Sequence, residues 1–194
     1  DIDASLPDVP IRIYGPPATS GTRDTLKTLF LEIGCRSDAS VVEMEAADPD
    51  SYEATCGELR GDGVYVEIGE DDELIVRNLE SEPNSLGVFG YSFLEENTEQ
   101  LRGIPIFNIT PNEETIGTKQ YPGARSLYLY VKRAHVGNVP GLLEYLQAFV
   151  EGGGKDGYLY EIGLIPLPTI ARDDLQQKVV SAESLPILSS TGLK

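Results

Sequence analysis

Short strand patterns alternate with amphipathic helix patterns along most of the chain, and this alternation limits the possible folds more than any other feature. Apolar runs typical of strands occupy residues 11–14, 64–68, 86–89, 104–109 and 127–131. Helix patterns lie between or after them, over residues 22–33, over a segment carrying Leu74, Ile75 and Leu79, over 91–101 and over 142–150. Because strands separated by helices form a sheet with helices on its faces, we predict an α/β fold.

Two regions lack a clear pattern. Residues 36–60 are acidic and irregular, and we predict no regular structure there. Residues 169–194 are weakly patterned, and we expect them to follow the surface.

The charge balance excludes some classes of partner. The 194 residues include 32 acidic and 15 basic side chains, a formal net charge of −17, and the basic residues form no run. Such a surface argues against nucleic acid or an anionic membrane as a partner. Any anion must therefore be bound by a local arrangement of donors.

Residues 19–23, Thr-Ser-Gly-Thr-Arg, form such an arrangement at the predicted start of the first helix. The first amides of a helix have no intrahelical acceptor and lie at the positive end of the helix dipole. The hydroxyls of Thr19, Ser20 and Thr22 and the guanidinium of Arg23 add further donors. The alternative is structural, with Ser20 or Thr22 acting only as the helix cap.

Catalytic interpretations of the same segment are weaker. Five residues rather than four separate Gly15 from Gly21, and no lysine follows Gly21, so the segment does not match a nucleotide-binding P-loop. A nucleophilic Ser20 lacks the GxSxG pattern, and the only histidine that could act as its base is His135. We therefore predict a protein that is not an enzyme.

Three other features remain open at this point. The acidic cluster at residues 70–73 lacks the spacing of a calcium loop, and we interpret it as a solvated helix start. Asn108-Ile109-Thr110 fits a glycosylation sequon, a triplet that arises easily by chance. Cys35 and Cys56 are either reduced thiols or a disulfide, and we expect no metal site because neither belongs to a CxxC pair.

Five blocks in order resemble the extracytoplasmic phosphate-binding proteins of ABC-type phosphate transporters, the PstS-like group of type II periplasmic binding proteins. They are IRIYGPPATSGTRDTL, DGVYVEIGEDDELIV, SLGVFGYSFLEEN, YPGARSLYLYVKRAHVGNVPGL and GYLYEIGLIPLP. The resemblance implies two α/β lobes with the anion between them. It assigns residues 8–122 to the second, ligand-binding lobe, a mixed sheet flanked by helices. Residues 123–194 would return to the first lobe, most of which would precede this chain.

The resemblance also implies the site. Ser20, Gly21 and Thr22 match the family's SGT element, which binds phosphate through amides and hydroxyls, and Thr19 and Arg23 flank it. Some members have an arginine four residues before the serine, where this chain has Pro16. The family's SRPL segment corresponds to Ala-Arg-Ser-Leu at 124–127, which makes Arg125 a further candidate.

Function, compartment and cross-link follow from the same resemblance. It implies a binding protein that delivers inorganic phosphate to a membrane permease, without a cofactor, in the periplasm or outside the cell. It also implies a Cys35–Cys56 disulfide and the loss of a leader together with the missing part of the first lobe. The alternative is a secreted phosphate-sensing or adhesin-like domain with the same fold. We also expect self-association through uncovered apolar surface, and weak phosphate binding with poor discrimination against sulfate.

Overall fold

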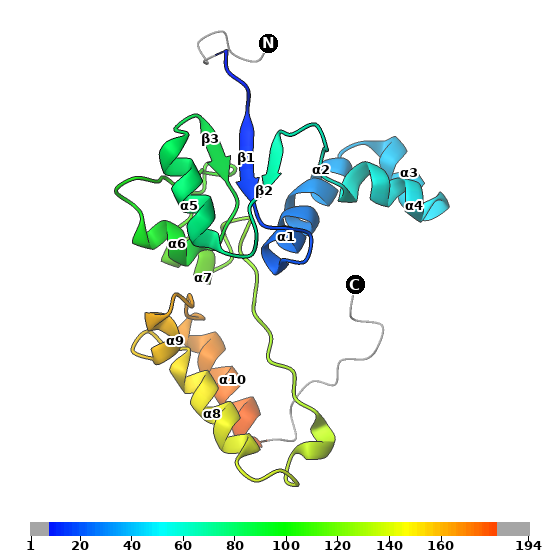
Figure 1. The fold of residues 1–194 in the computed structure, drawn as a ribbon. Helices are drawn as coiled ribbons and strands as arrows, with labels where there is room; N and C mark the ends of the chain where they lie inside the picture. Colours follow the sequence, from blue (N-terminus) through cyan, green and yellow to red (C-terminus); the bar gives the residue numbers. More distant parts are fainter. Residues whose placement is uncertain (1–7, 182–194) are drawn as a thin grey trace. The chain divides into compact units, whose positions relative to one another are not determined.

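A computed structural model describes residues 8–181 of the chain, and the strands within them form a three-stranded parallel sheet of order β2-β1-β3 (Figure 1). The strands are β1 (Arg12–Gly15), β2 (Tyr65–Glu67) and β3 (Ser85–Gly87). Ile13 pairs with Tyr65 on one side and with Leu86 on the other. The predicted α/β class is confirmed, and the three strands lie within the segments predicted for them or extend them by one residue.

The sheet is covered by α5 (Asp72–Ser81), which packs against β1 and β3 (Figure 1). Ile75 and Val76 of this helix and Tyr14 of β1 are buried, and Ile75 is fully enclosed. Asp71 begins the helix, since its carboxylate accepts a hydrogen bond from the Glu73 amide at 3.0 Å. The apolar positions of this helix therefore face the sheet, as their spacing predicts.

The helix that follows β1 is continuous from Gly21 to Cys35. It consists of α1 (Gly21–Leu26), the π-helical segment η1 (Lys27–Leu31) and α2 (Glu32–Cys35). It ends one residue beyond Gly34, close to the predicted boundary. None of the side chains in this segment is buried. Its position therefore depends on single side-chain contacts with neighbouring elements more than on the burial of an apolar face.

Residues 36–60, predicted to be irregular, are largely helical, so that prediction is wrong. They form α3 (Ala39–Ala47), α4 (Pro49–Tyr52) and the π-helical segment η2 (Glu53–Gly57). Asp38 and Asp48 cap the first two helices by accepting amide hydrogen bonds from Ser40 and Ser51. Hydrogen bonds from the two serine hydroxyls, together with these amide hydrogen bonds, lower the pKa of both carboxylates.

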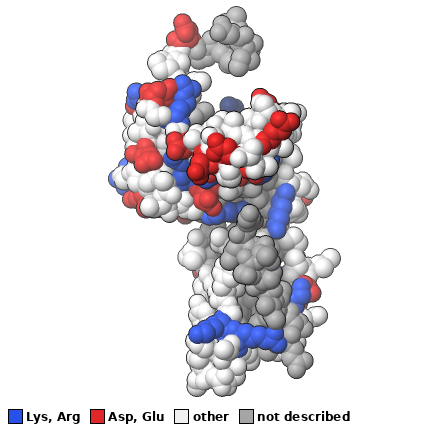
Figure 2. Space-filling model, turned by 90° about the vertical axis from the view of Figure 1, so that its right-hand side faces the viewer, with Lys and Arg blue, Asp and Glu red and all other residues white. Residues whose placement is uncertain are grey.

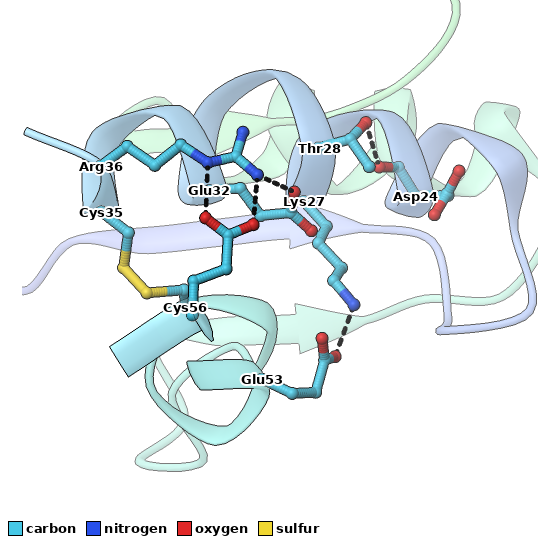
Figure 3. A network of polar contacts seen from close by, with 9 residues as sticks. Asp24, Lys27, Thr28, Glu32, Cys35, Arg36, Glu53 and Cys56 are labelled. Carbon is cyan, nitrogen blue, oxygen red and sulfur yellow. Dashed lines mark hydrogen bonds and ion pairs between the residues drawn. A yellow bond between two sulfur atoms is a disulfide. The ribbon is translucent and has the colours of Figure 1, made fainter. Parts of the chain in front are cut away.

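The predicted disulfide is confirmed, and Cys35–Cys56 joins the end of α2 to η2 (Figure 3). Lys27 pairs with Glu53 between the two π-helical segments, and Arg36 bonds Glu45 at 2.8 Å. The helix that begins at Gly21 is thus attached to the α3–η2 layer by one covalent bond and a few ion pairs.

Two predictions fail near the end of this part of the chain. The helix predicted over 91–101 is shorter, α6 (Tyr91–Glu96). The strand predicted over 104–109 is a tight turn, in which Ile106 and Ile109 exchange backbone hydrogen bonds of 3.1 and 3.0 Å. Phe107 and Asn108 at its tip have positive φ angles of 50° and 62°, which an extended strand does not allow.

Backbone contacts divide the chain into a unit that ends at Pro111 and a second unit that begins at Asn112. The second unit contains α7 (Glu113–Gly117), η3 (Arg133–His135), α8 (Leu142–Gly152), α9 (Tyr158–Glu161) and α10 (Thr169–Ser181). Its core is formed by Leu146, Val150 and Val179, with Val131 packed against them. The assignment of 8–122 and 123–194 to two lobes of a binding protein stays a prediction.

The second unit bears on two sequence predictions. Residues 169–181, expected to follow the surface, form the largely exposed helix α10, in which Val179 is buried, and residues 182–194 lie outside the described residues. The prediction of a strand over 127–131 is wrong. Residues 127–131, predicted as a strand, have no strand partner within the described chain, and Leu127 and Tyr128 are exposed. A segment with the composition of a strand needs a neighbouring strand to form hydrogen bonds with its backbone N–H and C=O groups. No helix within residues 8–181 has the length and apolar character required to span a bilayer.

Candidate anion-binding site

The loop after β1 leads into the helix start that the sequence singled out. Ser20 caps this helix, because its Oγ accepts a hydrogen bond from the Thr22 amide at 3.2 Å. The Ser20 amide itself donates to the Pro17 carbonyl at 3.0 Å. Within the described residues, the amides of Gly21 and Arg23 have no hydrogen-bond acceptor. The capping role is therefore confirmed, and it leaves two oriented donors free.

This helix start lies at an edge of the sheet where α/β proteins commonly bind ligands. β1 is the central strand, and the chain places β2 on one side of it and β3 on the other (Figure 1). The order of strands therefore reverses at β1. In open α/β sheets, ligands bind outside the carboxyl ends of the strands at such a point. The loop from Pro16 to Ser20 follows the carboxyl end of β1 directly.

Acidic side chains connect this loop to its neighbours. The Thr19 hydroxyl donates to Glu70 Oε1 at 2.5 Å, and Asp72 Oδ2 accepts a hydrogen bond from the Gly90 amide at 2.9 Å. Burial raises the pKa of Asp72, and the nearby Asp71 and Glu70 raise it further. No group of His, Cys, Asp and Glu among the described residues is arranged to hold a metal ion. The acidic block ties the β1, β2 and β3 loops together.

Arg23 is fixed in place on one side of the helix start. Its side chain is only 14% exposed, and its guanidinium carbon lies 4.5 Å from the centre of the Tyr65 ring. Nη1 lies 3.6 Å from Glu67 Oε1 and has no hydrogen-bond partner within the described structure. Arg23 therefore keeps a donor for a further acceptor while its plane is supported by Tyr65.

Tyr65 is a residue that the sequence interpretation missed. Its hydroxyl donates to the Pro16 carbonyl at 2.8 Å. A Cβ atom at Gly15 would lie 2.2 Å from that hydroxyl, so the glycine allows the tyrosine to approach the loop. Strand alternation in 64–67 places Tyr65 and Glu67 on the same face, which is the one signal for their common role.

Two further candidate residues, Arg125 and His135, lie outside the unit that contains the helix start. Arg125 and His135 belong to the second unit, Arg125 in an exposed segment without regular structure and His135 in η3. Arg125 as an anion ligand therefore stays a prediction. The Ser20 hydroxyl acts as a cap, which is a structural role and gives no sign of an activated nucleophile.

Comparison with known proteins decides the family. A family profile described as a PBP superfamily domain matches residues 2–151. The chain belongs to the PBP superfamily. The search of solved structures gave no significant match for this superfamily member.

Three curated relatives illustrate the similarity. Protein SphX of Synechococcus elongatus is 24% identical over 200 residues, covering 99% of this chain and 50% of the relative. Protein SphX of Synechocystis is 27% identical over 168 residues, covering 84% and 42%. The phosphate-binding protein PstS of Staphylococcus haemolyticus is 26% identical over 160 residues, covering 80% and 42%. These matches confirm the predicted resemblance to PstS-like proteins, and the chain spans about half the length of these relatives.

Proposed function

We propose that this chain binds inorganic phosphate as part of an extracytoplasmic substrate-binding protein that serves an ABC-type transporter. Two free amides, those of Gly21 and Arg23, carry the proposal, because they point outward from a helix start beyond the central strand. Relatives named as phosphate-binding proteins support the choice of anion.

The ligand set follows from the donors around these amides. The Ser20 oxygen accepts from the Thr22 amide, which leaves its own O–H free to donate to a phosphate oxygen. The Thr22 hydroxyl and the Arg23 guanidinium would add donors. Thr19 would join only after its hydroxyl leaves Glu70. Arg125, which belongs to the second unit, stays a candidate ligand.

The surroundings oppose anion binding at long range. The net charge of the chain is −17, and the face shown in Figure 2 carries many acidic side chains, with lysines and arginines among them. Donors that are already oriented replace the water around the anion without further ordering of the protein. Short-range hydrogen bonds therefore have to outweigh a repulsive field that salt partly screens.

The proposed role is binding and release, with no bond made or broken in the ligand. The protein would act outside the cytoplasm and present its ligand-bound form to a membrane permease. No cofactor takes part in this cycle.

The experiment removes one amide without removing the helix. Gly21 is the first helical residue, where proline is well tolerated, and the preceding Ser20 has the extended backbone that a following proline requires. Gly21→Pro deletes the donor, and Gly21→Ala keeps it as a matched control. Calorimetric titration with phosphate is expected to show at least about tenfold weaker binding for the proline variant, the value of one hydrogen bond to a charged group.

The alanine variant is expected to bind within about threefold of the unmodified protein, since only backbone flexibility changes. Equal affinities of the two variants would mean that the Gly21 amide is not a ligand. An unmodified protein that gives no heat with phosphate and no competition by arsenate would overturn the proposed function itself.

A further inference from the structure

We infer that Tyr65 is the positioning residue of the anion site, fixing the loop before the helix with its hydroxyl and the Arg23 guanidinium with its ring. The inference rests on the proposed function for its effect on affinity. Its structural part concerns only the orientation of the Gly21 and Arg23 amides.

The Tyr65 hydroxyl contacts the loop that precedes the helix. Tyr65 lies on β2, and its O–H reaches across to the Pro16 carbonyl at 2.8 Å. Pro16 is one of the most deeply enclosed residues of the described structure. The contact requires Gly15 to lack a side chain, because a Cβ atom there would lie 2.8 Å from Tyr65 Cζ. The position of the Pro16–Ser20 loop is thus set by a tyrosine on the neighbouring strand.

The Tyr65 ring contacts the side chain of Arg23. The guanidinium of Arg23 lies over the Tyr65 ring at 4.5 Å. Its only ion pair in the described structure is the 3.6 Å approach to Glu67, whose side chain is 52% exposed. An exposed pair at that distance orients a side chain weakly. The ring is therefore the more constant support for Arg23, which carries one of the two free amides.

Few other contacts fix the position of the helix that begins at Gly21. No side chain from Gly21 to Cys35 is buried in the described structure. Its carboxyl end is attached by the disulfide, and its amino end by the loop and Arg23. Burial raises the pKa of Tyr65, so its hydroxyl stays protonated and able to donate at neutral pH. One side chain therefore holds the amino end at two points.

The test uses Tyr65→Phe in the full 194-residue chain, which removes the hydroxyl and keeps the ring. We expect phosphate affinity to fall by about three- to tenfold, the effect of one hydrogen bond on the site. In the ligand-free protein, the backbone amide resonances of Gly21 and Arg23 are expected to move. Tyr145→Phe, which removes an exposed hydroxyl on α8 of the second unit, is expected to change neither quantity.

A pair of Arg23 variants tests the ring contact. Arg23→Lys keeps a cation that can lie over Tyr65 and is expected to retain more phosphate affinity than Arg23→Gln. Equal losses in the two variants would contradict a role for the ring.

The resonances separate this inference from the proposed function. An unmodified protein that does not bind phosphate would refute the function, while displaced Gly21 and Arg23 resonances in Tyr65→Phe would still support the positioning role. If these resonances coincide with those of the unmodified protein, the inference is overturned, whatever happens to the melting temperature.

Discussion

Reduction of the Cys35–Cys56 disulfide is expected to destabilise the first unit by about 3 kcal/mol. The two cysteines are 21 residues apart, and the chain-entropy relation for a loop of this length gives that value at 25 °C. The cross-link holds the carboxyl end of the helix whose amino end carries the proposed anion site. Its loss should therefore affect both stability and phosphate affinity.

Neighbouring contacts are too weak to compensate for the missing bond. Lys27–Glu53 joins η1 to η2 and Arg36–Glu45 joins the end of α2 to α3, but their side chains are partly exposed, and exposed ion pairs contribute little to stability. The helix from Gly21 to Cys35 has no buried side chain that could keep it in place.

Differential scanning calorimetry with and without a reductant measures the effect. We expect the melting temperature to fall by about 12 °C, since each kcal/mol corresponds to roughly 4 °C for a unit of this size. A double variant, Cys35→Ala with Cys56→Ala, should melt at the lower temperature and ignore the reductant. A shift below about 2 °C, with thiol titration showing both cysteines free, would mean that the disulfide contributes little to stability.

Three further predictions concern the core, the acidic block and selectivity. Asp72→Asn keeps an acceptor for the Gly90 amide and removes a carboxylate whose pKa is raised by burial. A carboxyl group whose pKa is raised on folding costs no stability at a pH below its unfolded pKa, where it is protonated in both states, and destabilises the fold once the pH exceeds its folded pKa. The variant should therefore increase the urea midpoint at pH ~7 and lose this advantage near pH ~4. An equal gain at both pH values would contradict this. Ile75→Ala should lower the free energy of unfolding by about 2–5 kcal/mol in urea titrations, because Ile75 is fully buried; a cost below about 1 kcal/mol would place it outside the core. All proposed phosphate ligands are donors, so calorimetry of this chain should show weak phosphate binding and a sulfate affinity within about tenfold, whereas sub-micromolar affinity with sulfate excluded would contradict the prediction.

Periodicity predicts the elements that bury one face. β1, β2 and β3 lie in apolar runs bounded by glycine or proline, and α5 and α8 show their apolar residues at helical spacing. These signals are local because each element packs its own apolar face against a neighbour.

Elements without such a face are missed. The apolar residues of α3 are spread around the helix and form no single face, so an analysis of apolar spacing overlooks it. The signals for α3 and α4 are their caps, Asp38 and Asp48. Residues 127–131 have the composition of a strand, but a strand forms only with a partner, and none lies within the described residues. Pairing partners are not encoded in the segment itself.

The candidate site was predictable in part. The cap at Ser20 and the free amides beyond it follow from local helix chemistry, and the residues are adjacent in the sequence. Tyr65 and Glu67 approach Arg23 from another strand, more than 40 residues away, through a parallel pairing that spacing alone does not reveal. The disulfide was predicted only through the family resemblance, since two cysteines alone fit either state.

A crystal structure of the protein grown with phosphate would locate the anion directly. We expect a phosphate oxygen within hydrogen-bond distance of the Gly21 and Arg23 amide nitrogens, with Ser20 still capping the helix. An anion bound elsewhere, or both amides occupied by the protein's own acceptors with no ion beside Gly21, would contradict it.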